Sequence, residues 1–208
     1  MDFALPKKFR AIQIYRIYFH RTCIWSFKEN KQSKFEKESW EEWVSLASAE
    51  AIPGSVSFLK FADQNGIQIF YISNRAESQM LATVGNLIAC GFPQANKDHL
   101  LLRNKISSKT ERRSNIAETH EIIMLCGDNL SDFSGIFEKK TAVKRHQLVD
   151  SLQTSFGSQF IILPNPMYGD WESAIYGNQN LAEPEKMELR RASLTPYKHQ
   201  EKPWVSAI

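Results

Sequence analysis

The stretch "EIIMLCGDNLSDF", residues 121–133, joins a run of apolar residues to a turn that carries two aspartates. A short, nearly continuous apolar run that ends at a glycine is typical of a strand covered on both faces of a parallel sheet. Asp128 and Asp132 follow that run. Gly, Asp, Asn and Ser all favour turns, so one interpretation is an ordinary turn. The other is a magnesium site at the carboxyl edge of a parallel sheet.

Two further segments have the same strand character: "IQIFYIS" (67–73) and "QFIILP" (159–164). Helical spacing of apolar residues, with Gly and Pro at the ends, separates the strands. The predicted helices cover residues 53–66, 77–92, 108–120 and 141–157, with a short one near 183–193. Alternating strands and helices predict an α/β fold with a parallel sheet flanked by helices.

Composition narrows the class of protein. The chain has 208 residues, 42% of them hydrophobic and 24% charged, which is ordinary for a globular domain. A net charge of +3 is too small to argue for a nucleic acid polymer as partner. No run of about 18 apolar residues predicts a transmembrane segment. Basic residues interrupt every apolar stretch near the N-terminus, so we expect no signal peptide and a cytoplasmic location.

Polar residues follow the predicted strands. Ser73, Asn74 and Arg75 come after the first, and Asp128 and Asp132 after the second. The segment "SSKTERR" (107–113) adds Lys109 between them. Because ligands of open α/β sheets bind beyond the carboxyl ends of the strands, these groups are expected to meet. A hydroxyl, a lysine and carboxylates suit a phosphate held with a divalent metal.

Four motifs in this order resemble the class C acid phosphatases, the bacterial lipoprotein e family of the haloacid dehalogenase-like superfamily. They are "FYISNR" (70–75), "SSKTERR", "GDNLSDF" (127–133) and "LPNPMYGDWE" (163–172). The resemblance covers about residues 35–176 and implies a three-layer, Rossmann-like fold. It also implies Mg²⁺-dependent hydrolysis of small phosphomonoesters such as nucleoside 5′-monophosphates. Members of the family are exported, often as lipoproteins.

The resemblance assigns roles to matching residues. The Ser73 hydroxyl would bond the phosphoryl oxygens, and Lys109 would stabilise the nucleophile and the transferring phosphoryl group. Asp128 would be a direct magnesium ligand. Asp132 would support either the water shell of the metal or the lysine. Taken alone, Lys109 could equally be a solvated helix residue.

Substrate contacts follow from the same resemblance. Asn74 and Arg75 would shape the phosphate loop. Trp40, in "SWEEWV", and Tyr168 would be the aromatic residues at the substrate mouth, where a base could stack between them. The simpler interpretation of Trp40 and Trp43 is packing of one helix face, and for Trp43 we prefer it.

One motif of the family is missing. The superfamily mechanism needs a DxDxT motif, whose first aspartate attacks phosphorus and whose second acts as acid and base. Family spacing would place these two groups near Gln13 and Tyr15. Neither is a carboxylate, and residues 1–35 contain only Asp2 and Glu29 as acids. We nevertheless expect residues 9–19 to form the central strand.

Three explanations remain open for the missing motif: a truncated or frame-shifted N-terminus, a pseudoenzyme that binds without cleaving, or a nucleophile from elsewhere. We favour the first. The expected organisation is an atypical segment 1–26, a haloacid dehalogenase-like domain 27–182 and a charged tail 183–208. The predicted function is an impaired Mg²⁺-dependent acid phosphatase, or else an inactive phosphate- or nucleotide-binding protein.

Overall fold

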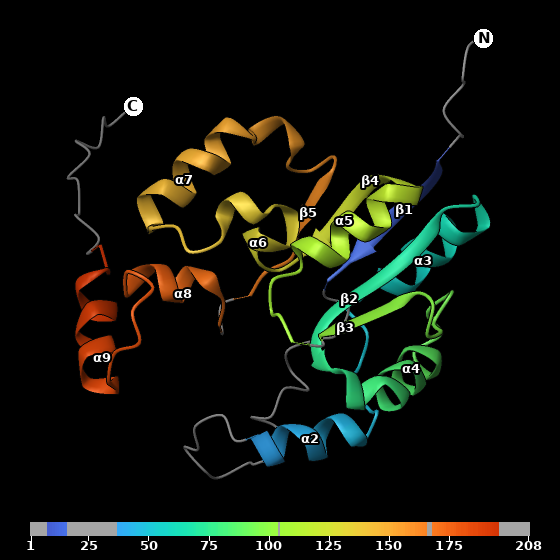
Figure 1. Ribbon diagram of the computed structural model, residues 1–208, viewed down its shortest axis with the longest axis horizontal. Helices are drawn as coiled ribbons and strands as arrows, with labels where there is room; N and C mark the ends of the chain where they lie inside the picture. The colour runs from blue at the N-terminus through green and yellow to red at the C-terminus, as the bar shows by residue number, and fades with distance from the viewer. Residues whose placement is uncertain (1–7, 16–36, 104, 166–167, 196–208) are drawn as a thin grey trace, which may run out of the picture.

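The computed structural model describes residues 8–15, 37–103, 105–165 and 168–195. Its centre is one sheet of five strands in the order β3-β2-β1-β4-β5 (Figure 1). All four pairs of neighbouring strands are parallel. The strands are β1 (Phe9–Ile14), β2 (Gln68–Ala76), β3 (Leu100–Arg103), β4 (His120–Gly127) and β5 (Phe160–Ile162). The predicted α/β fold with a parallel sheet is therefore confirmed.

The N-terminal segment supplies the central strand. Ile14 of β1 lies in register with Tyr71 of β2 and with Cys126 of β4. The last four residues of β1 are buried. The prediction of a central strand is confirmed for residues 9–14, and residues 16–19 lie outside the described part of the chain. The register brings the carboxyl ends of β1, β2 and β4 to one edge.

Helices cover both faces of the sheet. On one face, α3 (Ser55–Gln64) and α4 (Met80–Ala89) bury Leu59 and Leu87 against Ile12 and Ile14. On the other face, α5 (Thr110–Thr119) and α6 (Leu130–Phe133) pack in the cluster that contains Ala11 and Tyr15. Successive side chains of β1 thus point to opposite faces, as strand geometry requires.

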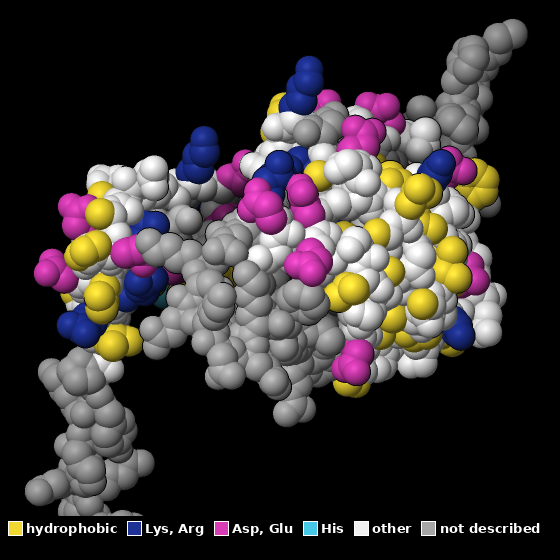
Figure 2. Space-filling view, turned by 90° about the horizontal axis from the view of Figure 1, so that it is seen from below, with side chains coloured by type: hydrophobic (Ala, Val, Ile, Leu, Met, Phe, Trp, Pro, Cys, Tyr) yellow, Lys and Arg dark blue, Asp and Glu magenta, His cyan; other side chains and the backbone are white. Residues whose placement is uncertain are grey.

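The outer surface of α3 and α4 is apolar in places. Figure 2 shows hydrophobic side chains gathered on one part of the molecular surface. The exposed ones from these two helices are Phe58, Phe61, Leu81 and Ile88. Each of the two helices packs its buried leucine, Leu59 or Leu87, against the sheet. The exposed side chains lie on the other side of each helix and point away from the sheet.

The remaining helices are α2 (Lys37–Ser45), α7 (Ala142–Ser151), α8 (Asp170–Ile175) and α9 (Glu183–Ala192). α9, inside the predicted tail, contacts α8 through an ion pair in which Arg190 Nη1 lies 2.9 Å from Glu172 Oε1. Strand β3 was not among the predicted strands. Within the described ranges, no helix combines the length and the apolar character needed to cross a membrane.

Candidate active site

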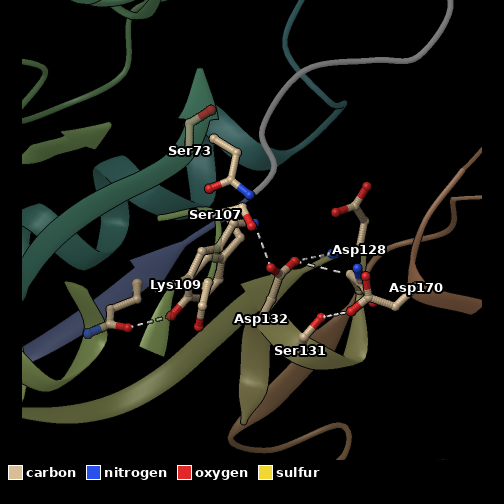
Figure 3. Close-up of polar contacts among 12 residues, drawn as sticks. Ser73, Ser107, Lys109, Asp128, Ser131, Asp132 and Asp170 are labelled. Carbon is tan, nitrogen blue, oxygen red and sulfur yellow. Dashed lines mark hydrogen bonds and ion pairs between the residues drawn. The ribbon is translucent and has the colours of Figure 1, made fainter. Parts of the chain in front are cut away.

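An ion pair joins two of the predicted site residues. Lys109, the residue that precedes α5, donates from Nζ to Asp132 Oδ1 at 2.6 Å (Figure 3). The other carboxylate oxygen of Asp132 accepts the backbone N–H groups of Asp128 and Asn129 at 3.3 and 3.2 Å. Asp132 is 2% exposed, and burial raises the pKa of its carboxyl while the Lys109 ammonium lowers it. Of the two supporting roles expected for Asp132, the geometry shows the one toward the lysine.

Gly127 makes room for Asp132. A Cβ atom at position 127 would lie 2.6 Å from Asp132 Oδ2 and 2.7 Å from Asp132 Cβ, closer than side chains approach. The turn after β4 can therefore fold its second carboxylate back onto its own amides only because residue 127 has no side chain. This is the physical reason for the glycine that ends the apolar run.

Arg112 ties the Ser73 loop to the Lys109 loop. Its guanidinium donates to the backbone oxygen of Ser73 at 2.7 Å and to Asn74 Oδ1 at 2.6 Å. It also donates to the backbone oxygens of Ser107 and Ser108, both at 3.3 Å. The planar guanidinium with five donors suits such a bridge between chain segments. Ser73, Asn74 and the residues before Lys109 are thereby brought together.

Asp128 is held by a residue of the fourth motif. Asn165, after β5, donates from Nδ2 to Asp128 Oδ2 at 2.6 Å. The Oδ1 atom of Asn165 accepts the backbone N–H of Tyr168 at 3.4 Å. Asn165 therefore links the predicted metal ligand to the loop of the predicted substrate aromatic. The Tyr168 side chain itself is 57% exposed.

Asp170, at the start of α8, also reaches the turn after β4. Its carboxylate accepts a short hydrogen bond from the Ser131 hydroxyl (Figure 3). Ser131 lies between the two aspartates of the turn in the sequence. The turn is thus fixed from two sides, by Lys109 and by Asp170.

The structure directs Arg75 away from the phosphate loop. Its guanidinium carbon lies 5.4 Å from the Trp43 ring centre and 5.8 Å from that of Trp40. Its Nη1 donates to Thr83 Oγ1 at 3.1 Å, and the residue is buried. The rings of Trp40 and Trp43 lie 5.2 Å apart. The Arg75 side chain therefore packs against α2 and α4, and its backbone N–H donates to the Ser73 hydroxyl oxygen at 3.2 Å.

Comparisons with known proteins agree with this geometry. The model of HAD superfamily subfamily IIIB acid phosphatases matches residues 25–171. The chain belongs to this family. The class C acid phosphatase from Bacillus anthracis superposes with a TM-score of 0.82 and 37% identity, over 92% of this chain and 82% of that one. A structure of the class C enzyme of that organism with tungstate bound gives 0.81 and 38% over the same shares.

Plant relatives are more distant. Stem 31 kDa glycoprotein of Glycine max is 28% identical over 141 residues, which is 65% of this chain and 49% of the relative. Acid phosphatase 1 of Solanum lycopersicum is 27% identical over 142 residues, which is 64% and 48%. The chain spans about half the length of these curated relatives.

In this acid phosphatase family member, Tyr15 rather than Gln13 stands beside the lysine. Lys109 Nζ lies 5.0 Å from the centre of the Tyr15 ring. Gln13 lies two residues earlier, on the same face of β1, and is 0% exposed. The Tyr15 hydroxyl donates to Gln13 Oε1 at 2.6 Å. Of the two positions expected for the missing carboxylates, Gln13 and Tyr15, the structure shows a contact of Lys109 with Tyr15. Which of the two corresponds to the nucleophile stays a prediction.

Among the described residues, the two predicted metal ligands leave a magnesium site short of carboxylates. Family phosphatases generally use a divalent metal, and Mg²⁺ needs six oxygen ligands from carboxylates, waters and substrate phosphate. Of the two predicted ligands, Asp132 accepts from Lys109 with one carboxylate oxygen and from two backbone amides with the other. Asp128 is then the one predicted carboxylate left. The described residues contain no group of three or more His, Cys, Asp or Glu that could hold a metal.

Arg112 and Asn165 were not among the predicted site residues. Both lie inside the quoted motifs "SSKTERR" and "LPNPMYGDWE". An arginine and an asparagine beside a turn carry no local pattern that separates a bridging role from a solvated one. Only the contact between separate loops shows what these two side chains do.

Proposed function

We propose that this chain binds phosphomonoesters at the carboxyl edge of its sheet and that its hydrolytic step is impaired. The observation that supports the binding site is the meeting of the Ser73 loop, Lys109 and the aspartate turn through Arg112 and Asp132. The Ser73 hydroxyl and Lys109 would contact the phosphoryl oxygens. A half-buried lysine fixed by one carboxylate offers its remaining N–H groups to an anion.

Impairment follows from the residue beside Lys109. In the family mechanism, a carboxylate at this place attacks phosphorus and becomes an aspartyl phosphate. A second carboxylate protonates the leaving oxygen and then activates water. Burial raises the pKa of Tyr15 to about 12, so its phenol is neutral at working pH. A neutral phenol whose hydrogen is donated to Gln13 supplies neither of these functions.

The body of the substrate is proposed to lie near Trp40 and Tyr168, as in a nucleoside 5′-monophosphate whose base stacks on an aromatic ring. Tyr168 supports this part, since it is exposed and its loop is tied to Asp128 through Asn165. Trp40 supports it less, because its ring already packs against Trp43 and near Arg75.

Hydrolysis of p-nitrophenyl phosphate tests the proposal, with and without Mg²⁺. We expect no turnover above the buffer rate for the chain itself. The double variant Tyr15→Asp, Ile17→Asp restores the DxD spacing from the position beside Lys109 and should raise the rate by at least about 100-fold. Ile17 lies outside the described residues and is chosen from its place in the sequence.

A matched control is Gln13→Asp, Tyr15→Asp, which carries the same two carboxylates two residues earlier. We expect this control to stay inactive and to fold less stably, because position 13 is fully buried. Robust hydrolysis by the unmodified chain would refute the impairment. Equal activation of both double variants would refute the placement of Tyr15.

A further inference from the structure

The predicted phosphate site lies among charged side chains of both signs. Lys109, Arg112 and Arg113 belong to the start of α5, and Arg113 donates to the backbone oxygen of Asp132 at 2.9 Å. The carboxylates near them are Asp128, Asp132 and Glu138, and the last accepts hydrogen bonds from the Ser108 and Thr110 hydroxyls on either side of Lys109. The corner around Lys109 thus holds three cations and three carboxylates.

Two carboxylates that the family would add to this corner are absent from the sequence. Residues 13 to 17 read Gln-Ile-Tyr-Arg-Ile, so none of them supplies a carboxylate. A site with that extra pair of carboxylates would repel a phosphate dianion, and a divalent cation would offset the repulsion. Here that pair is missing, which removes both its repulsion toward a phosphate dianion and the carboxylate oxygens that it would offer to a cation.

We propose that the site around Ser73 and Lys109 binds a tetrahedral oxyanion, free phosphate or the phosphoryl group of an ester, without a divalent metal. The inference rests on the proposed phosphate site and adds that this site needs no divalent metal to bind its anion. It depends on three observations: the engaged oxygens of Asp132, the single remaining carboxylate of Asp128, and the neutral side chain of Tyr15 beneath Lys109.

Arg112 and the ammonium provide the attraction in place of a metal. The N–H groups of Arg112 donate to backbone oxygens and to the Asn74 side chain. Arg112 would therefore contribute positive charge and hold the loops in place, rather than bond the phosphate directly. Lys109 has three N–H donors and gives one to Asp132. A phosphate oxygen placed between Lys109 and the Ser73 hydroxyl would meet the charge-assisted hydrogen bonds that bind such anions well.

Isothermal titration of the full chain with inorganic phosphate tests this inference, once in EDTA and once in excess Mg²⁺. We expect the two dissociation constants to agree within about twofold. Lys109→Met should weaken binding by about tenfold or more in both buffers, the loss of one charge-assisted contact. Lys97→Gln, which removes an exposed lysine before the amino end of β3 and hence at the opposite edge of the sheet, should leave both values unchanged.

Two variants at position 15 sharpen the test. Tyr15→Asp adds one carboxylate and should weaken phosphate binding by about tenfold in EDTA, with recovery in Mg²⁺. Tyr15→Asn has nearly the same shape without the charge and should remain insensitive to EDTA. Melting curves show that each variant is folded.

The outcomes separate the inference from the proposed function. Binding that requires Mg²⁺ would overturn the inference and leave the phosphate site standing. A folded chain that binds phosphate in neither buffer would overturn both. Equal EDTA sensitivity of Tyr15→Asp and Tyr15→Asn would show that charge at this position does not control metal dependence, and would also overturn the inference.

Discussion

Two corners of the same sheet edge differ in how their polar groups are satisfied. At the end of β4, both oxygens of buried Asp132 are bonded, to an ammonium and to two amides. At the end of β1, Gln13 is just as buried, yet its Nε2 has no hydrogen-bond partner among the described residues. The first corner carries two aspartates that match the family motif, whereas residues 13–17 at the second contain no acid.

This difference shows that forming a central strand and forming a buried polar site place different requirements on the side chains. β1 keeps its place because its backbone pairs with β2 and β4 and because Ala11, Ile12 and Ile14 are apolar. Those requirements are met by many sequences. A buried polar network works only when each member has its partner. The corner at the end of β4, where Asp132 bonds Lys109 and two amides, meets that condition and is called the acid corner below. The corner at Gln13 does not meet it.

The largest effect is expected at the acid corner. Asp132→Ala would leave the Lys109 ammonium and two loop amides without their acceptor, which costs about 3 to 5 kcal/mol of unfolding free energy. Chemical denaturation measures it, and the melting temperature should fall as well. Asp132→Asn, which keeps the shape and one acceptor oxygen, should cost less. A loss under about 1 kcal/mol for Asp132→Ala would show that the ion pair is not structural.

Gly127→Ala tests the close approach of Asp132. The added methyl would overlap the carboxylate and should cost about 1 to 3 kcal/mol, measured by urea unfolding. Gly85→Ala in α4 is the matched control. Nothing lies within 4 Å of the atom that this substitution adds, so stability should rise by up to about 1 kcal/mol. Equal effects of the two variants would contradict the packing argument.

The pH dependence of stability reports the burial of Tyr15. Burial raises its pKa from 10.0 to about 12, so the native state holds the phenolic proton more tightly than the unfolded chain. This contribution is fully present below pH 10 and is lost as pH rises through 12. At pH 11 the loss is about 1.4 kcal/mol. The stability difference between the chain and Tyr15→Phe, followed from pH 8 to 11, should shrink by that amount; a constant difference would contradict it.

The smallest effect is expected where both members of the β1 pair are removed. Gln13→Leu with Tyr15→Phe deletes a donor and an acceptor together, along with an orphaned amide, so stability should change by no more than about 1 kcal/mol. Gln13→Leu alone leaves the Tyr15 hydroxyl without its acceptor and should be worse than the double variant. Denaturation of the three proteins decides the order, and a large loss in the double variant would show that this corner is as structural as the acid corner.

Much of the fold could be predicted from the sequence, because apolar periodicity is a local property. Strands near residues 67–73 and 121–127 and the helices between them were found within a few residues of their bounds. The short edge strand β3 was missed. Among the site residues, Lys109 and Asp132 form an ion pair. The side chain of Arg75 packs toward Trp43, and its expected part in shaping the phosphate loop stays a prediction, since nothing local shows on which side of a loop a long side chain packs.

The alternation of strands and helices along the chain, and with it the expectation that residues 73, 109 and 128 lie at one sheet edge, followed from the sequence alone. Parallel strands joined by helices leave no other place for their carboxyl ends. The tertiary structure decided that Tyr15 rather than Gln13 lies under Lys109, and that Asp132 bonds the lysine. These outcomes depend on the register between strands and on contacts between distant loops, where a shift of one residue turns a side chain to the opposite face.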